Sequence, residues 1–232
     1  MEKLKTYAII LASGSGNRFG SELPKQFCKI ENKTLLEWSV EAFNNSDCID
    51  KIILVINEEY KQKASEILSN KYKKLSKIII GGKTRKDSSF NGVSSIDETQ
   101  ANVLIHDCAR PFVSQRLISE CVNALNSYLA IGIGINSSDT IVEIENNTIK
   151  NIPQRNKLRK IQTPQAFKLS IIKKAHELAK EDNDFTDDCG LVVKYNLAEV
   201  FMIEGEEGNI KITYPNDIKI AQILNIQKNK SR

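Results

Sequence analysis

The sequence predicts a doubly wound α/β fold, in which a mostly parallel sheet is covered by helices on both faces. Four short runs rich in Ile and Val recur in the first half of the chain, beginning at Tyr7, Lys51, Lys77 and Asn102. Helical patterns lie between them, at 34–43, 58–68 and 89–96. Continuous apolar strands that alternate with helices are typical of βαβ units, whose parallel strands are buried on both sides.

The alternation of predicted strands and helices ends at about residue 136. Short alternating segments surround the turn-prone "ENN" in "DTIVEIENNTIKNIP", which predicts a hairpin. Helical periodicity returns in "KLSIIKKAHELAK", where Leu169, Ile172, Ala175 and Leu178 fall on one face. Further helices are expected to begin near Asp187 and after Pro215. No linker divides the chain, so we expect one domain over residues 1–232, with a β-arm at about 137–160.

Composition excludes several classes of protein. The net charge is only +4, and the basic runs "KYKKLSK" and "QKNKSR" fit solvated helix ends better than a nucleic-acid site. The five cysteines contain no C-x-x-C pair, which argues against a disulfide framework or a zinc site. The first apolar segment is too short for a signal peptide or membrane span. We expect a cytoplasmic protein without nucleic-acid or membrane partners.

The loop "LASGSGNRFG" follows the first predicted strand and has the glycines of a phosphate-binding loop. Gly14 and Gly16 are followed by Phe19 where a dinucleotide fingerprint needs a third glycine, and neither fits the register of a P-loop. Arg18 and Lys25 add two cations within a dozen residues. Backbone that can close on an anion, together with fixed positive charge, suits phosphoryl transfer. The alternative is a tight turn with surface cations.

Two more polar segments follow predicted strands, "GGKTRKDS" and "HDCARPF". Ligands of doubly wound sheets bind outside the carboxyl ends of strands, so the glycine loops are expected to line one crevice. The first segment could instead be a turn with Thr84 as a helix cap. In the second, Asp107 could bind a metal or a sugar hydroxyl, or form a structural pair with Arg110. His106 is interpreted as a packed residue, and His176 as an ordinary helix residue.

Two later segments are rich in polar groups. Residues 152–167 contain Arg155, Arg159, Lys160 and Thr163. A solvated basic loop is the alternative for Lys157 and Lys160, but it accounts poorly for the segment as a whole. In "EGNIKITYPND", Lys211 alternates with isoleucines on a predicted strand and so points away from them, into water or into the crevice.

In order, "ASGSGNRFGSELPKQF", "GGKTRKDS", "HDCARPFV", "DT", "QTPQAF", "FTDD" and "NIKIT" resemble the cytidylyltransferases that act on alditol phosphates. These are the methylerythritol-phosphate enzymes of isoprenoid synthesis and the ribitol-5-phosphate enzymes of teichoic acid and capsule synthesis. The resemblance implies a Rossmann-like nucleotidyltransferase fold with a protruding β-arm that forms a homodimer. It also implies that CTP and an alditol phosphate give a CDP-alditol and pyrophosphate, with Mg²⁺.

The resemblance also implies roles for individual residues. Catalytic charge stabilisation is assigned to Arg18, Lys25 and Lys211. Nucleotide binding is assigned to Leu11, Ala12, Ser13, Gly14, Gly16, Gly81, Gly82, Ser88 and Asp107, and Asp107 is also the expected metal ligand. Substrate binding is assigned to Arg110, Thr140, Arg155 and Thr163, with Thr140 and Arg155 reaching the partner subunit's site from the arm.

The motifs differ in which acceptor they favour. Arg159 replaces a Trp usual in the methylerythritol enzymes, and "FTDDCGLV" looks more like ribitol-type domains, whereas "HDCARPF" leans toward the isoprenoid enzymes. We therefore expect D-ribitol 5-phosphate as the acceptor, with 2-C-methyl-D-erythritol 4-phosphate as the alternative. A sugar-1-phosphate nucleotidylyltransferase using UTP or GTP, and a nucleotide-binding protein without turnover, are further alternatives.

Overall fold

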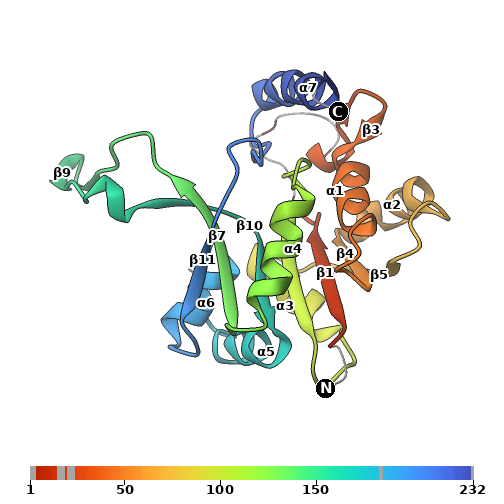
Figure 1. Cartoon of the computed structure of the whole chain (residues 1–232), viewed down its shortest axis with the longest axis horizontal. Helices are drawn as coiled ribbons and strands as arrows, with labels where there is room; N and C mark the ends of the chain where they lie inside the picture. Colours follow the sequence, from red (N-terminus) through yellow and green to blue (C-terminus); the bar gives the residue numbers. More distant parts are fainter. Residues whose placement is uncertain (1–3, 15–18, 20–23, 183–184, 231–232) are drawn as a thin grey trace.

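The computed structural model describes residues 4–14, 19, 24–182 and 185–230, with side chains up to residue 226. In these residues seven strands form one sheet in the order β11-β7-β10-β6-β1-β4-β5. The strands are β1 (Thr6–Leu11), β4 (Lys51–Ile56), β5 (Leu75–Ile80), β6 (Asn102–Asp107), β7 (Ala130–Asn136), β10 (Arg159–Lys168) and β11 (Val200–Glu204). All neighbours are parallel except β10, which is antiparallel to β6 and β7. The predicted α/β fold with a mostly parallel sheet is confirmed (Figure 1).

Helices cover both faces of the sheet. One face is packed by α1 (Leu35–Asn44), α2 (Lys61–Leu68) and α4 (Gln115–Ala124), and the other by α3 (Arg85–Ser94), α5 (Leu169–Leu178) and α6 (Asp188–Lys194). The last helix, α7 (Pro215–Lys230), packs beside the small hairpin β2 (Lys29–Ile30) and β3 (Lys33–Thr34). Single 3₁₀ turns lie at η1 (Lys25–Phe27), η2 (Glu58–Tyr60) and η3 (Arg155–Lys157).

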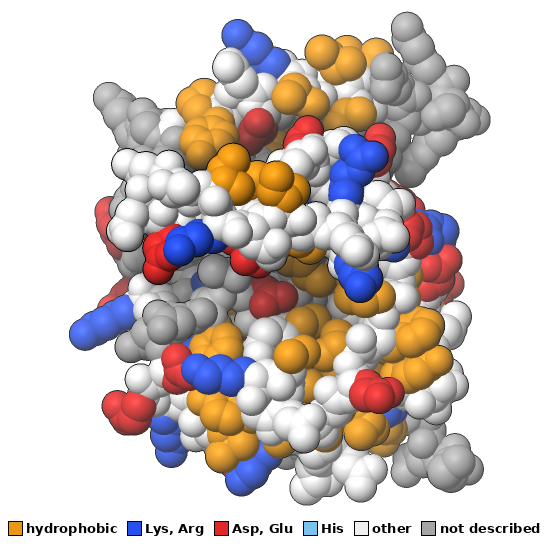
Figure 2. Space-filling view, turned by 90° about the vertical axis from the view of Figure 1, so that its left-hand side faces the viewer, with side chains coloured by type: hydrophobic (Ala, Val, Ile, Leu, Met, Phe, Trp, Pro, Cys, Tyr) orange, Lys and Arg blue, Asp and Glu red, His pale blue; other side chains and the backbone are white. Residues whose placement is uncertain are grey.

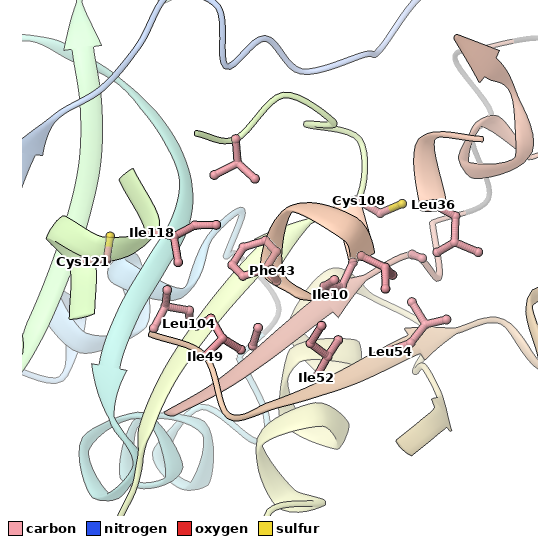
Figure 3. Close-up of a cluster of buried hydrophobic side chains, with 14 of the residues drawn as sticks. Ile10, Leu36, Phe43, Ile49, Ile52, Leu54, Leu104, Cys108, Ile118 and Cys121 are labelled. Atoms are coloured by element: carbon pink, nitrogen blue, oxygen red, sulfur yellow. The ribbon is translucent and has the colours of Figure 1, made fainter. Parts of the chain in front are cut away.

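The central strands β1 and β4 are almost entirely apolar because successive side chains enter opposite cores. Ile10, Ile52 and Leu54 pack with Leu36 and Phe43 of α1, as Figure 3 shows. The intervening residues of the same strands, such as Ile9 and Ile53, join the core on the other face. Alternate residues of one apolar strand therefore pack against the helices on opposite faces of the sheet.

Helix starts agree with local capping rules. Thr34 and Glu37 form a capping box at α1, and Thr84 and Asp87 form one at α3. Asp187 accepts the backbone N–H of Gly190 at the start of α6, as expected from its position. The cap at Thr84 begins α3 at Arg85, four residues earlier than the predicted start.

The arm projects from the sheet between β7 and β10 (Figure 1). It contains the predicted hairpin, with β8 (Glu143–Glu145) paired to β9 (Thr148–Asn151) around Asn146 and Asn147. Both asparagines have positive φ, 49° and 61°, which a tight hairpin turn requires and asparagine tolerates. Five apolar side chains of the arm are exposed: Ile141, Val142, Ile144, Ile149 and Ile152. Figure 2, which faces this side, shows hydrophobic side chains among charged ones.

Three details differ from the predictions. Leu178 is 44% exposed while His176 is buried, because His176 finds polar partners on α3 and α6. The segment around Lys211 is irregular and not a strand, and the sheet is completed by β11 instead. Residues 159–168 form β10, whose second half is buried in the middle of the sheet, so Lys160 lies on a strand and not in the solvated loop that was its alternative. In the described part of the chain no helix is both long and apolar enough to span a bilayer.

Candidate active site

A cavity of about 440 Å³ opens at the carboxyl ends of β1, β4, β5 and β6. The predicted residues that line it are Leu11, Ala12, Ser13, Gly14, Lys25, Gly82, Ser88, Asp107 and Lys211. Parallel strands end at the same edge of the sheet, so loops distant in sequence converge there, as expected. Gly16 and Arg18 lie outside the described residues.

The first two glycine-bearing loops touch directly. Ser13 Oγ donates to Ser88 Oγ at 2.7 Å, and the backbone N–H of Gly82 donates to the same oxygen at 3.1 Å. A Cβ at Gly81 would lie 2.5 Å from Ser13 Cβ, so a side chain there would force the loops apart. At Gly14 a Cβ would meet none of the described atoms within 4 Å, which leaves this backbone open to a ligand.

Asp107 is the acidic centre of this cavity. Its Oδ1 accepts from Arg85 Nε at 3.1 Å, and its Oδ2 accepts from Lys211 Nζ at 2.6 Å. Burial alone would raise the pKa of the carboxyl, but the charges of Arg85 and Lys211 outweigh it and hold the pKa far below its usual range. Asp107 is therefore a fixed carboxylate at neutral pH.

The two predicted catalytic lysines converge on this centre. Lys25 Nζ donates to the carbonyl oxygen of Ile212 at 3.0 Å, beside Lys211 in the chain. Ile212 is fully buried, which anchors the irregular segment although it is not a strand. Both ammonium groups belong to residues of the cavity wall, where they can neutralise phosphate oxygens.

A second cavity, of about 480 Å³, adjoins the first through Lys211, which lines both. Its wall includes Arg110 and Lys160. Arg110 is largely buried, and its guanidinium donates to the carbonyl oxygens of Asn209 at 2.8 Å and Ile161 at 3.2 Å. Burial lowers the pKa of Arg110, which the charge of Asp107 partly offsets. A phosphate bound there would face cationic side chains from two sides.

The other predicted substrate residues lie apart. Thr163 is buried on β10, where its hydroxyl oxygen accepts the backbone N–H of Asp107 at 3.1 Å. Arg155 is exposed at the base of the arm, and its Nη1 donates to the carbonyl oxygen of Ser138 at 3.2 Å, which borders the second cavity. Thr140 is exposed on the arm and lines neither cavity.

Several residues of the first cavity were not predicted: Gln26, Asn57, Lys83, Thr84, Arg85, Cys108 and Ala109. Arg85 is the most informative of them, because it holds Asp107. A cation in the first turn of a helix opposes the helix dipole, so Arg85 in "GGKTRKDS" was a signal that acidic partners lie nearby. Burial raises the pKa of the Cys108 thiol to about 12, so this cysteine is an unreactive part of the wall.

The described residues of the first cavity offer one carboxylate, that of Asp107, to a divalent cation. Among the described residues no group of three or more His, Cys, Asp or Glu side chains is placed to hold a metal. Mg²⁺ at nucleotide sites commonly uses one or two carboxylates, with phosphate oxygens and water completing the shell. Asp107 fits that role as a single protein ligand, provided that Lys211 or Arg85 releases one of its oxygens.

Glycine loops at the strand ends, lysines in the wall of the cavity and one fixed carboxylate define a nucleotidyltransferase. The model of the 2-C-methyl-D-erythritol 4-phosphate cytidylyltransferase (IspD) family matches residues 6–226, and the chain belongs to this family. It is thus a cytidylyltransferase, an enzyme that uses CTP. Enzymes of this family typically use a divalent cation.

Individual relatives agree with this membership. The chain is 39% identical to 2-C-methyl-D-erythritol 4-phosphate cytidylyltransferase of Thermobifida fusca, with 94% of this chain and 92% of that protein covered. It is also 39% identical to the bifunctional ribulose 5-phosphate reductase/CDP-ribitol pyrophosphorylase Bcs1 of Haemophilus influenzae, covering 97% of this chain and 49% of that protein. The solved 4-diphosphocytidyl-2C-methyl-D-erythritol synthase of Anaerococcus prevotii superimposes with a TM-score of 0.85 and 31% identity, over 97% and 96% of the two chains.

Proposed function

We propose that the enzyme transfers the cytidylyl group of CTP to 2-C-methyl-D-erythritol 4-phosphate. The observation that carries this proposal is the family match over residues 6–226, whose description names this acceptor, as does the Thermobifida fusca relative. The preference for D-ribitol 5-phosphate drawn from the motifs is less well supported. It remains the second candidate, because the Haemophilus influenzae relative that covers 97% of the chain carries CDP-ribitol pyrophosphorylase in its name.

In this reaction a phosphate oxygen of the acceptor attacks the α-phosphorus of CTP in line. The new bond forms as the bond between the α-phosphorus and the bridging oxygen breaks, and pyrophosphate leaves with that electron pair. No covalent nucleophile is needed. The first cavity binds the nucleotide, the second binds the alditol phosphate, and Lys211 lies between them.

Lys25 and Lys211 neutralise the charge that grows on the phosphate oxygens as the α-phosphorus becomes crowded. The loop at Ala12–Gly14 surrounds the phosphates, assisted by Arg18, and the turn at Gly81 and Gly82 holds the nucleoside end of CTP. Asp107 would hold Mg²⁺, which when bound adds positive charge against the triphosphate. The protein thus supplies position and charge compensation.

The arm completes the acceptor site from a second subunit in this proposal. Its exposed isoleucines need a partner surface, and neither Arg155 nor Thr140 lines a cavity of its own subunit. A symmetric homodimer would place each arm against the partner's second cavity.

The acceptor is tested with purified protein, CTP and Mg²⁺. Pyrophosphate release is followed with methylerythritol 4-phosphate, with ribitol 5-phosphate or with neither, and phosphorus NMR identifies the diphosphate product. A kcat/KM at least about tenfold higher for methylerythritol 4-phosphate supports the proposal. The opposite ratio transfers the assignment to ribitol 5-phosphate, and competition by UTP and GTP measures nucleotide selectivity.

A further inference from the structure

A line of charged and polar side chains runs from the half-buried Arg85 at the cavity wall to fully buried residues between α3, α5 and α6. Asp107 Oδ1 accepts from Arg85 Nε at 3.1 Å, and Arg85 Nη1 donates to Asp188 Oδ2 at 2.7 Å. Asp188 Oδ1 accepts from Ser89 Oγ at 2.5 Å. One guanidinium therefore joins two carboxylates that lie on different elements, β6 and α6.

Arg85 is held more firmly by these carboxylates than a surface arginine would be. Burial would lower its pKa, but Asp188 and Asp107 raise it well above its usual value. Two different nitrogens are engaged, so the plane of the guanidinium is set by both partners at once. Its Nη2 is buried with no partner among the described residues, which leaves the contacts to Asp107 and Asp188 as the ones that orient it.

Asp188 is itself fixed from several sides. It is fully buried, and its backbone N–H donates to Gln165 Oε1 at 2.9 Å. Ser89 has one hydroxyl proton, which the contact with Asp188 uses, so His176 Nε2, 3.1 Å away, donates to Ser89 Oγ. His176 Nδ1 then has no proton, and it has no partner among the described residues.

Ser89, His176 and Asp188 are not a hydrolytic triad. Ser89 is fully buried, and its hydroxyl points to the carboxylate and not to the imidazole as a nucleophile would. The order of the hydrogen bonds shows instead a rigid support for Asp188. Arg85 connects this support to Asp107.

We propose that Arg85 and Asp188 are positioning residues that aim the Asp107 carboxylate into the nucleotide cavity. Asp188 acts through Arg85: without its charge the guanidinium loses one of two anchors, and Asp107 loses a fixed partner opposite Lys211. Groups that hold a ligand residue commonly change affinity or activity by about 10-fold to 100-fold when they are removed. The inference rests on the role of Asp107 in the proposed function.

The experiment is a double-mutant cycle with Asp188→Asn, Arg85→Met and both together. Each variant is characterised by kcat, KM for CTP, the Mg²⁺ concentration at half-maximal rate, CTP affinity by calorimetry, and Tm. We expect Asp188→Asn to lower kcat/KM for CTP about tenfold, with a higher Mg²⁺ requirement. In the Arg85→Met background the same change is expected to cost less than about twofold, because its route to Asp107 is already lost.

Two variants keep the test independent of folding. Ser89→Ala removes one contact of Asp188 while leaving its charge, and it should show a smaller loss of the same kind. Lys86→Met lies on the same helix and removes a buried ammonium that caps the carbonyl oxygens of Ala179 and Asp182, at 2.6 and 2.7 Å. It should lower Tm without changing the Mg²⁺ requirement.

Independent, multiplicative losses in the double variant would overturn the proposal, as would an Asp188→Asn enzyme that is merely less stable. Asp107→Asn separates this result from the proposed function. If that variant keeps full turnover, the role of Asp107 itself is wrong. If it is inactive while Asp188→Asn has wild-type kinetics and Mg²⁺ dependence, only the positioning role fails.

Discussion

Thr163 Oγ1 lies 3.1 Å from Nδ1 of His106, and the other nitrogen of the ring determines the direction of this hydrogen bond. His106 Nε2 lies 3.0 Å from the carbonyl oxygen of Arg110, which can only accept, so Nε2 is the protonated nitrogen. Nδ1 must then accept from the Thr163 hydroxyl, whose oxygen also accepts the N–H of Asp107. A neutral histidine thus connects the carbonyl oxygen of Arg110, through the Thr163 hydroxyl, to the backbone N–H of Asp107.

Thr163→Val should destabilise the protein and impair catalysis together. It leaves the N–H of Asp107 and Nδ1 of His106 without a partner, at a cost of about 2 kcal/mol in the free energy of unfolding. Thr163→Ser keeps the hydroxyl and should recover most of that loss. Urea denaturation and steady-state kinetics of both variants measure this, and a larger loss in Thr163→Ser than in Thr163→Val would show that the methyl group, not the hydroxyl, matters.

The stability of the fold should fall in mild acid. Burial lowers the pKa of His106 to about 4, from an ordinary value near 6.5. Below pH 6.5 the unfolded chain binds a proton that the native state refuses, so the stabilisation is complete above pH 6.5 and is lost as the pH falls toward 4. At pH 5 this proton uptake lowers the free energy of unfolding by about 2 kcal/mol relative to its value above pH 6.5.

This dependence is measured by urea denaturation between pH 4 and 8 for the wild type and His106→Gln. As the pH falls, the free energy of unfolding of the wild type should decrease more than that of the variant, because the glutamine does not titrate. Parallel curves would contradict the assignment. His176, whose pKa is also lowered by burial, remains in both proteins and so cancels in the difference.

Lys25→Ala should reduce kcat by about 100-fold or more, because it removes a cation from the transferring phosphate. The Tm should change little. Lys29→Ala is the matched control, since Lys29 is exposed four residues further on and does not line the cavity. Pyrophosphate release and thermal denaturation measure both variants. A Lys25→Ala enzyme with unchanged kcat would remove this lysine from the catalytic group.

The contribution of the arm in trans can be tested by complementation. Arg155→Ala and Lys211→Ala should each be inactive alone, because one lacks the arm contact and the other the cation between the cavities. Mixed and re-equilibrated in equal amounts, they should recover about a quarter of wild-type activity, since half of the dimers are mixed and each has one intact site. Mixtures as inactive as their components would place both residues in one subunit's site.

Much of the fold follows from local patterns. The apolar runs at β1, β4 and β6 are buried on both sides, that at β5 is half-buried at the sheet edge, and all four could be predicted as parallel strands. The strands of the second half were harder, because β10 carries Arg159, Lys160 and Pro164, which local preference assigns to a loop. Its place between β6 and β7 supplies partners that override that preference.

The sequence by itself determined that glycines, lysines and Asp107 follow strand ends, and the parallel fold made a common cavity the expected result. Only the tertiary structure determined which of the charged side chains pair with one another. Lys211 meets Asp107 across 104 residues and Arg85 meets Asp188 across 103, which no local spacing encodes. The physical reason is that capping and strand alternation depend on neighbours in the chain, whereas the pairing of buried charges depends on which elements the sheet order brings together.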